Sequence, residues 1–215
     1  MPPLQFPGNP LYFSAGSDRL TQHNRMCYVV YIMQPMTVMK SALEQYADKT
    51  HFLFSAQDFY PLFSDLTVEN IRMLLSRAAK SGVLERVCKG IYLAPKSGYD
   101  PTLVLFKVSA KLRADCLNYV SLETVLSHSG AISQQPLAWI TVMTTGRSGT
   151  ISCGRFGTVE LIHTAKPRAR ILPHLRLDAR TGMWWADEAL ALQDMQDARR
   201  DTGLVDGEMR SFVVE

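Results

Sequence analysis

The sequence contains no apolar run long enough to cross a membrane. A spanning helix needs about 18 or more apolar residues in succession, and the apolar run CYVVYIM at residues 27–33 is much shorter. The four cysteines are widely spaced, with no CxxC pair and no histidine nearby at ligand spacing. We therefore expect no membrane span, no zinc site and the reduced cysteines of a cytoplasmic protein.

Patterns typical of enzyme active sites are also missing. No glycine-rich loop stands between a strand and a helix where it could hold phosphates. The GSD at residues 16–18 is followed by no Asp-x-Asp pair that could bind metal for nucleotidyl transfer. A nuclease would need clustered carboxylates and a lysine, and the nearest set, Asp100, Glu160 and Lys166, lacks that spacing. We predict a protein that is not an enzyme and binds no metal or cofactor.

Length and charge suggest two parts. The chain of 215 residues, 47% of them apolar, can form one large domain or two small ones. Residues 99–180 contain ten Lys or Arg against five Asp or Glu, whereas residues 181–215 contain three against eight. An acidic C-terminal helix of this kind can lie on a basic surface of its own chain, meet a basic partner or simply face solvent.

The most informative pattern lies in residues 64–95. Apolar residues recur at three-and-four spacing from Val68 to Ala79, and Thr67 and Gly82 suit the two ends of a helix. Beyond Gly82 the apolar residues alternate on either side of a CKG turn at residues 88–90. We predict a helix over 67–81 followed by a β-hairpin.

Polar side chains on this helix and hairpin suit the recognition helix and wing of a DNA-binding domain. In the major groove, Asn70 could pair with adenine and Arg72 with guanine, while the later residues and the hairpin would contact phosphates. The alternative is a solvated helix face with a structural role. The predicted DNA-binding residues are Thr67, Asn70, Arg72, Arg77, Lys80, Arg86 and Lys89.

The neighbouring residues predict a winged helix-turn-helix domain over residues 36–98. The expected elements before the recognition helix are a helix over 37–47, a strand at 51–54 that pairs with the wing and a helix over 55–63. Residues 1–35 contain five prolines and no amphipathic helix. They are either a flexible arm or, as we favour, precede a true start at Met33 or Met36.

A second domain of α+β class is expected over residues 99–215. Its predicted elements are helices over 101–115, 121–128 and 185–199 and strands over 138–144, 150–153 and 158–163. Trp184 and Trp185 would begin the last helix, with one of them in the core. A secondary basic surface for flanking DNA or for an acidic or RNA-bearing partner, unless it is only solvated loop, would comprise Arg147, Arg155, Lys166, Arg168 and Arg170.

Two blocks of the sequence resemble the AbiEi-type antitoxins, transcriptional regulators of type IV toxin–antitoxin systems that act in abortive infection and phage defence. The block IRMLLSRAAKSGVLERVCKGIYLAP at residues 71–95 is similar to the recognition helix and wing of that family. The block NYVSLETVLSHSGAISQQPLAWITVMTTGRSG at residues 118–149 is similar to the signature of its C-terminal domain. The second block is the more specific, since the first matches many regulators.

The resemblance implies a function in two parts. An N-terminal winged helix would bind double-stranded DNA at inverted repeats in its own promoter, and a C-terminal domain would neutralise a partner nucleotidyltransferase toxin. The second domain of this chain is shorter than in the larger members of the family. Two alternatives remain: a stand-alone winged-helix regulator, and a protein-interaction adaptor without a toxin.

Overall fold

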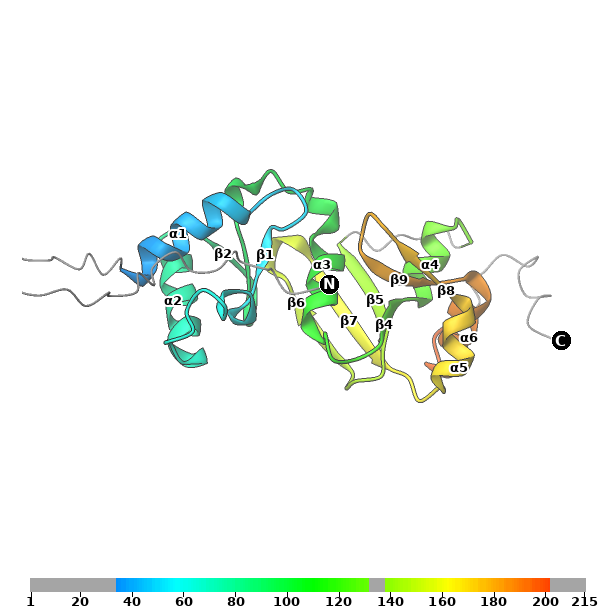
Figure 1. Ribbon diagram of the computed structural model, residues 1–215. Helices are drawn as coiled ribbons and strands as arrows, with labels where there is room; N and C mark the ends of the chain where they lie inside the picture. The colour runs from blue at the N-terminus through cyan, green and yellow to red at the C-terminus, as the bar shows by residue number, and fades with distance from the viewer. Residues whose placement is uncertain (1–33, 132–137, 202–215) are drawn as a thin grey trace, which may run out of the picture. The chain divides into compact units, whose positions relative to one another are not determined.

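The computed structural model describes residues 34–131 and 138–201, which form two compact units of mixed α+β class (Figure 1). The first unit comprises the described chain up to Arg86 together with Tyr92–Gly98, and the second comprises Val87–Ile91 together with the chain from Tyr99 onward. Residues 1–33, which hold most of the predicted arm and the possible start at Met33, lie outside the described residues. Within the described ranges, no helix combines the length and the apolar character that crossing a bilayer requires.

The first unit is built from helices around a small antiparallel sheet. Its strands lie in the order β1-β3-β2, and β1 pairs with β3 through Leu53 opposite Leu93. This pairing confirms the short strand that was expected to join the hairpin. In chain order the elements are α1 (Pro35–Tyr46), β1 (Leu53–Phe54), a 3₁₀ helix (Ala56–Phe59), α2 (Val68–Lys80), β2 (Glu85–Cys88) and β3 (Ile91–Leu93).

Helix α2 follows the sequence pattern closely. The Thr67 hydroxyl accepts a hydrogen bond from the Asn70 amide at 3.2 Å and caps the start. Gly82 has a φ of +75°, which glycine adopts readily, and the chain leaves the helix there. The apolar face is buried in the core of the unit through Ile71, Leu74, Leu75 and Ala78.

The predicted helix over residues 55–63 is wrong beyond its first turn. Ser55 and Asp58 form a capping box, so the start signal was correct. The turn that follows is a 3₁₀ helix that ends at Phe59. The reason lies at Pro61, which has no amide hydrogen and so cannot donate the next backbone hydrogen bond of a continuing helix.

The second unit is a six-stranded mixed sheet with helices packed against it. The strand order is β6-β7-β5-β4-β9-β8, with parallel pairing of β5 with β7 and of β4 with β9. The elements are α3 (Val104–Leu112), β4 (Asn118–Val120), α4 (Leu122–His128), β5 (Trp139–Thr144), β6 (Gly149–Ser152), β7 (Thr158–His163), α5 (Arg168–Ile171), β8 (Leu175–Asp178), β9 (Met183–Ala186) and α6 (Glu188–Asp197). The predicted helices that became α3 and α4, and the strands that became β5, β6 and β7, are confirmed.

Helices lie on both faces of this sheet. Successive strand residues point to opposite faces, and β9 illustrates the two environments. Trp185 packs against Phe106 of α3, with ring centroids 5.5 Å apart. On the other face, Tyr119 of β4 is the register partner of Trp184 and lies beside the buried carboxylate of Asp194 in α6. Burial, and secondarily the charge of Asp194, raises the pKa of Tyr119 above its usual range. Both sheet faces are therefore covered over the central strands.

The start of the predicted last helix is wrong. Residues 183–186 form β9, and α6 begins only after Asp187, whose side chain accepts a hydrogen bond from the Leu190 amide at 2.8 Å. Neither tryptophan is fully buried: Trp185 is half-buried and Trp184 is 42% exposed. The short strands β4 and β8 were not predicted either.

Candidate nucleic-acid interface

The side chains predicted to contact DNA are all exposed. In α2, Asn70, Arg72, Arg77 and Lys80 point away from the buried apolar face, and Thr67 is exposed at the cap. Arg86 is exposed on β2 and Lys89 in the hairpin turn. The first unit therefore presents a polar helix face with a net positive charge.

The position of each residue around α2 refines this interface. Each residue advances about 100° around a helix, so Asn70 and Arg72 lie on opposite flanks of the exposed face. The line directly opposite the buried residues contains Glu69, Met73, Ser76 and Lys80. The Met73 side chain is unusual there, because it is apolar and 55% exposed. The sequence pattern had not marked Met73 or Ser76 as candidates.

Arg72 is held by a neighbour on its own helix. Its guanidinium lies 3.1 Å from the Glu69 carboxylate, and both side chains are well exposed. An exposed ion pair of this spacing contributes only about 0.3 to 0.5 kcal/mol. Arg72 can therefore leave Glu69 for a base at little cost, although the carboxylate places negative charge in the middle of the polar face.

Two of the predicted phosphate contacts share one hollow in the first unit. Lys80 from the end of α2 and Arg86 from β2 both line an open depression of about 530 Å³ between the helix and the hairpin. Ser76 and Tyr92 contribute to the same depression, and Glu85 is its acidic member. A phosphate group seated there would face two cations.

The tip of the hairpin belongs to the second unit. Val87, Cys88 and Ile91 are buried, whereas Lys89 and Gly90 are exposed. The Cys88 thiol is the hydrogen-bond partner of Cys153, and this contact together with burial raises the pKa of the Cys153 thiol. The predicted wing is therefore not a free hairpin, and only its turn is open to solvent.

The secondary basic surface needs one correction. Lys166 is largely buried and binds the carboxylates of Asp194 at 2.6 Å and Asp197 at 2.9 Å, so it does not add to an open basic surface. These contacts place the acidic helix α6 on a basic residue of its own chain. Arg155 is exposed, and its guanidinium donates to the Tyr99 hydroxyl at 2.8 Å and lies over the Phe156 ring. Arg147, Arg168 and Arg170 are exposed, the last two on α5.

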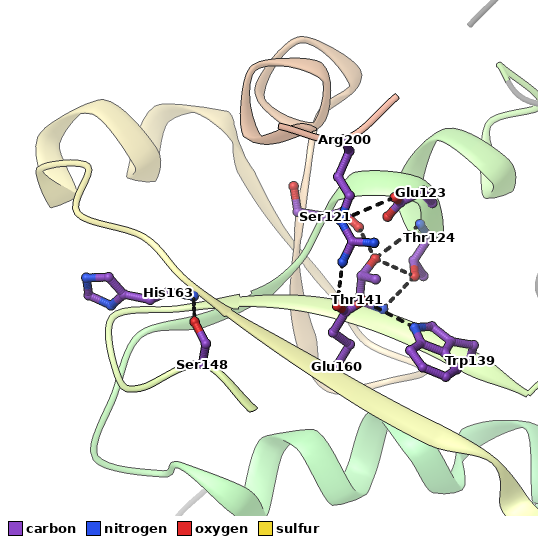
Figure 2. Close-up of polar contacts among 9 residues, drawn as sticks. All are labelled: Ser121, Glu123, Thr124, Trp139, Thr141, Ser148, Glu160, His163 and Arg200. Atoms are coloured by element: carbon purple, nitrogen blue, oxygen red, sulfur yellow. Dashed lines mark hydrogen bonds and ion pairs between the residues drawn. The ribbon is translucent and has the colours of Figure 1, made fainter. Parts of the chain in front are cut away.

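A polar network in the second unit ties α4 to the sheet (Figure 2). The Thr141 hydroxyl donates to the Ser121 carbonyl at 2.8 Å, and the Thr141 amide donates to the Thr124 hydroxyl at 2.8 Å. Glu160 of β7 accepts hydrogen bonds from Trp139 and Arg200. These contacts fix side chains in place, and they bring no nucleophile to a base.

Ser148 and His163 lie together in the same view, but not as a catalytic pair. The serine hydroxyl accepts from the backbone amide of His163 at 2.9 Å, and the imidazole nitrogen Nδ1 instead lies 2.8 Å from the Gly146 carbonyl (Figure 2). A serine nucleophile needs its hydroxyl bonded to the imidazole. These contacts join the β5–β6 turn, which holds Gly146 and Ser148, to the end of β7.

No protein-family model matches the chain, and no curated protein matches it significantly. The residues themselves and the resemblance of the two sequence blocks are therefore the grounds for assigning a function.

Proposed function

We propose that this chain is a DNA-binding antitoxin that represses its own operon and neutralises a partner nucleotidyltransferase toxin. The first unit acts as a winged helix-turn-helix, with α2 in the major groove and the β2–β3 hairpin beside it. The observation that carries the proposal is the exposed polar face of α2 together with the hollow shared by Lys80 and Arg86.

In this docking, the two halves of α2 have different tasks. Asn70, Arg72 and Met73 meet base edges near the start of the helix, where amide, guanidinium and apolar groups distinguish adenine, guanine and the thymine methyl. Lys80 and Arg86 hold a phosphate at the shared hollow and so fix the register. Glu69 orients Arg72 before DNA arrives.

Arg72→Ala is expected to relax sequence specificity, whereas Lys80→Ala weakens binding to all duplexes alike. Loss of a bidentate base contact costs about 1 to 3 kcal/mol of discrimination, and loss of one phosphate contact lowers the salt slope by about one. The measurement is fluorescence anisotropy at two salt concentrations, with the duplex upstream of the gene and a scrambled duplex. Lys40→Ala, an exposed lysine on α1, is the matched control. If Arg72→Ala and Lys80→Ala both bind the two duplexes as the wild type does, this docking is wrong.

Glu69→Gln is expected to tighten binding to any duplex about threefold, because it removes a negative charge from the middle of the α2 face and releases Arg72. The same anisotropy assay measures the change, and the gain should shrink as salt rises. Glu44→Gln removes an exposed carboxylate of α1, outside the α2 face. An equal gain in both variants would mean that only the net charge matters.

For the antitoxin part, we propose that the second unit carries the toxin-binding surface. Leu177 and Trp184 form a cross-strand pair at the β8 edge of the sheet, and they are 59% and 42% exposed. Exposed apolar pairs of this kind are typical of protein interfaces. Co-expression with a nucleotidyltransferase encoded beside the gene should restore growth, and Leu177→Arg should abolish the rescue. Failure of the wild-type chain to rescue would leave a stand-alone regulator.

A protein-interaction adaptor is the second candidate. The exposed Met73 and Tyr60 of the first unit favour it, since both are apolar and neither is needed for phosphate binding. Binding to DNA through several phosphates falls steeply with salt, so absence of DNA binding at low salt would move the adaptor to first place.

A further inference from the structure

The second unit contains a hollow that DNA binding does not use. Its volume is about 500 Å³, within the range of about 300 to 1,000 Å³ that small-molecule sites occupy. The lining comes from α3, α4, the start of β5, the β6–β7 connection and β9. Its aromatic members are Phe106, His128, Trp139, Phe156 and Trp185.

One aromatic wall is fixed by ring contacts. The Trp185 ring lies 5.5 Å from Phe106 and 5.1 Å from His128, measured between ring centroids. Its indole NH donates to the Thr181 hydroxyl at 3.1 Å, so the polar end of the ring is bonded away from the hollow. Offset and tilted rings at such distances are a favourable packing arrangement. A planar ligand would meet a surface that is already in place.

Trp139 contributes a second aromatic ring, which is hydrogen-bonded in place and partly exposed to solvent. The side chain is 39% exposed. Its indole NH donates to Glu160 at 3.3 Å, and Glu160 in turn is paired with Arg200 (Figure 2). A large exposed ring that is fixed by a half-buried carboxylate loses little conformational entropy when a ligand stacks on it.

The polar groups of the hollow favour an anionic ligand. The Ser127 hydroxyl is buried and has no hydrogen-bond partner among the described residues, and buried polar groups are otherwise almost always bonded. Among the described lining residues, Arg155 is the one Lys or Arg, and none is an Asp or Glu. Arg155 lies over the Phe156 ring at 4.4 Å, at the aromatic margin of the hollow.

We propose that this hollow binds a planar aromatic carboxylate of one or two rings. The rings pack against the aromatic side chains that line the hollow, Arg155 attracts the carboxylate, and Ser127 donates the hydrogen bond that its hydroxyl otherwise lacks. The site is independent of the proposed DNA binding, because all of its residues belong to the second unit.

The test uses the full chain and 2-naphthoate as the probe, with isothermal titration calorimetry and saturation-transfer NMR. The expected result is saturable binding to one site, with affinity at least tenfold above that for the neutral 2-naphthamide. Trp139→Ala should weaken 2-naphthoate binding at least tenfold. Trp184→Ala, an equally large exposed ring outside the hollow, should leave it unchanged.

Arg155→Gln provides a second variant that keeps the core intact. It should remove the preference for 2-naphthoate over 2-naphthamide while leaving the affinity for 2-naphthamide as it was. Absence of saturable binding to the wild type would overturn the proposal. Equal losses of 2-naphthoate affinity in Trp139→Ala and Trp184→Ala would also overturn it, because they would indicate nonspecific adhesion to exposed rings. Equal affinity for 2-naphthoate and 2-naphthamide would overturn it as well. If adenosine binds more tightly than 2-naphthoate, the ligand is a neutral heterocycle and the proposed carboxylate is wrong.

Discussion

Lys166→Met is expected to lower the free energy of unfolding of the second unit by about 3 to 5 kcal/mol at neutral pH. Asp194 has no exposed surface, and its carboxylate is bonded to the Lys166 ammonium at 2.6 Å and to the Ser121 hydroxyl at 2.7 Å. Removal of the lysine leaves a buried charge without its counterion. Urea unfolding followed by tryptophan fluorescence measures this directly, because all three tryptophans lie in the second unit.

Two further variants separate the buried pair from general loss of charge. Asp197→Asn removes the other partner of Lys166. The Asp197 side chain is 63% exposed, so the free energy of unfolding should fall by less than about 1 kcal/mol. The double variant Lys166→Met with Asp194→Asn should recover most of the loss, because no buried charge remains. Equal destabilisation by the single and double variants would contradict this account.

The pair also gives the second unit a pH dependence. Burial lowers the pKa of Lys166, but the hydrogen bonds and charges of Asp194 and Asp197 outweigh it, so the pKa is raised above the ordinary value of 10.5. A raised folded-state pKa stabilises the fold fully below the unfolded-state value, and this stability is lost as pH rises through the folded-state value. Burial also raises the pKa of Tyr119, and this shift changes the stability in the same direction. Stability should fall above about pH 10, and less steeply in Lys166→Met.

Local signals were enough to predict the long elements. The three-and-four spacing of α2 with its cap at Thr67, the run of apolar and β-branched residues in β5 and the alternation along β7 describe a helix and strands that the fold contains. The short strands β4 and β9 could not be found in this way, because three or four residues do not establish a period. They are strands because the chain pairs them in parallel, Tyr119 with Trp184.

The candidate sites divide in the same manner. Residues on the exposed face of α2 could be named from the sequence, since helical period alone decides which side chains point outward. The position of Lys166 could not, because its partner Asp194 is 28 residues away and belongs to α6. The aromatic hollow likewise combines side chains from α3, α4, β5 and β9, and only the folded sheet brings them together.

Gly157→Ala is expected to destabilise the second unit by at least about 3 kcal/mol, with the same fluorescence measurement as the readout. A Cβ at this position would lie 1.9 Å from the Ala138 carbonyl oxygen, a backbone atom that cannot move aside alone. That oxygen accepts the hydrogen bond of the Thr158 amide at 2.8 Å, next to the first residue pair of β5 and β7. The φ of +114° adds strain for any side chain.

Gly154→Ala isolates the steric part of this effect. Gly154 lies in the same connection with a φ of +58°, and a Cβ there would meet no atom within 4 Å. Its substitution should cost only the backbone strain of about 1 kcal/mol. Because Ala138 precedes Trp139, displacement of this carbonyl in Gly157→Ala should also move the Trp139 ring and weaken 2-naphthoate binding, whereas Gly154→Ala should bind as the wild type does. Equal stability losses in the two variants would mean that the close approach of Gly157 to Ala138 does not hold β5 in place.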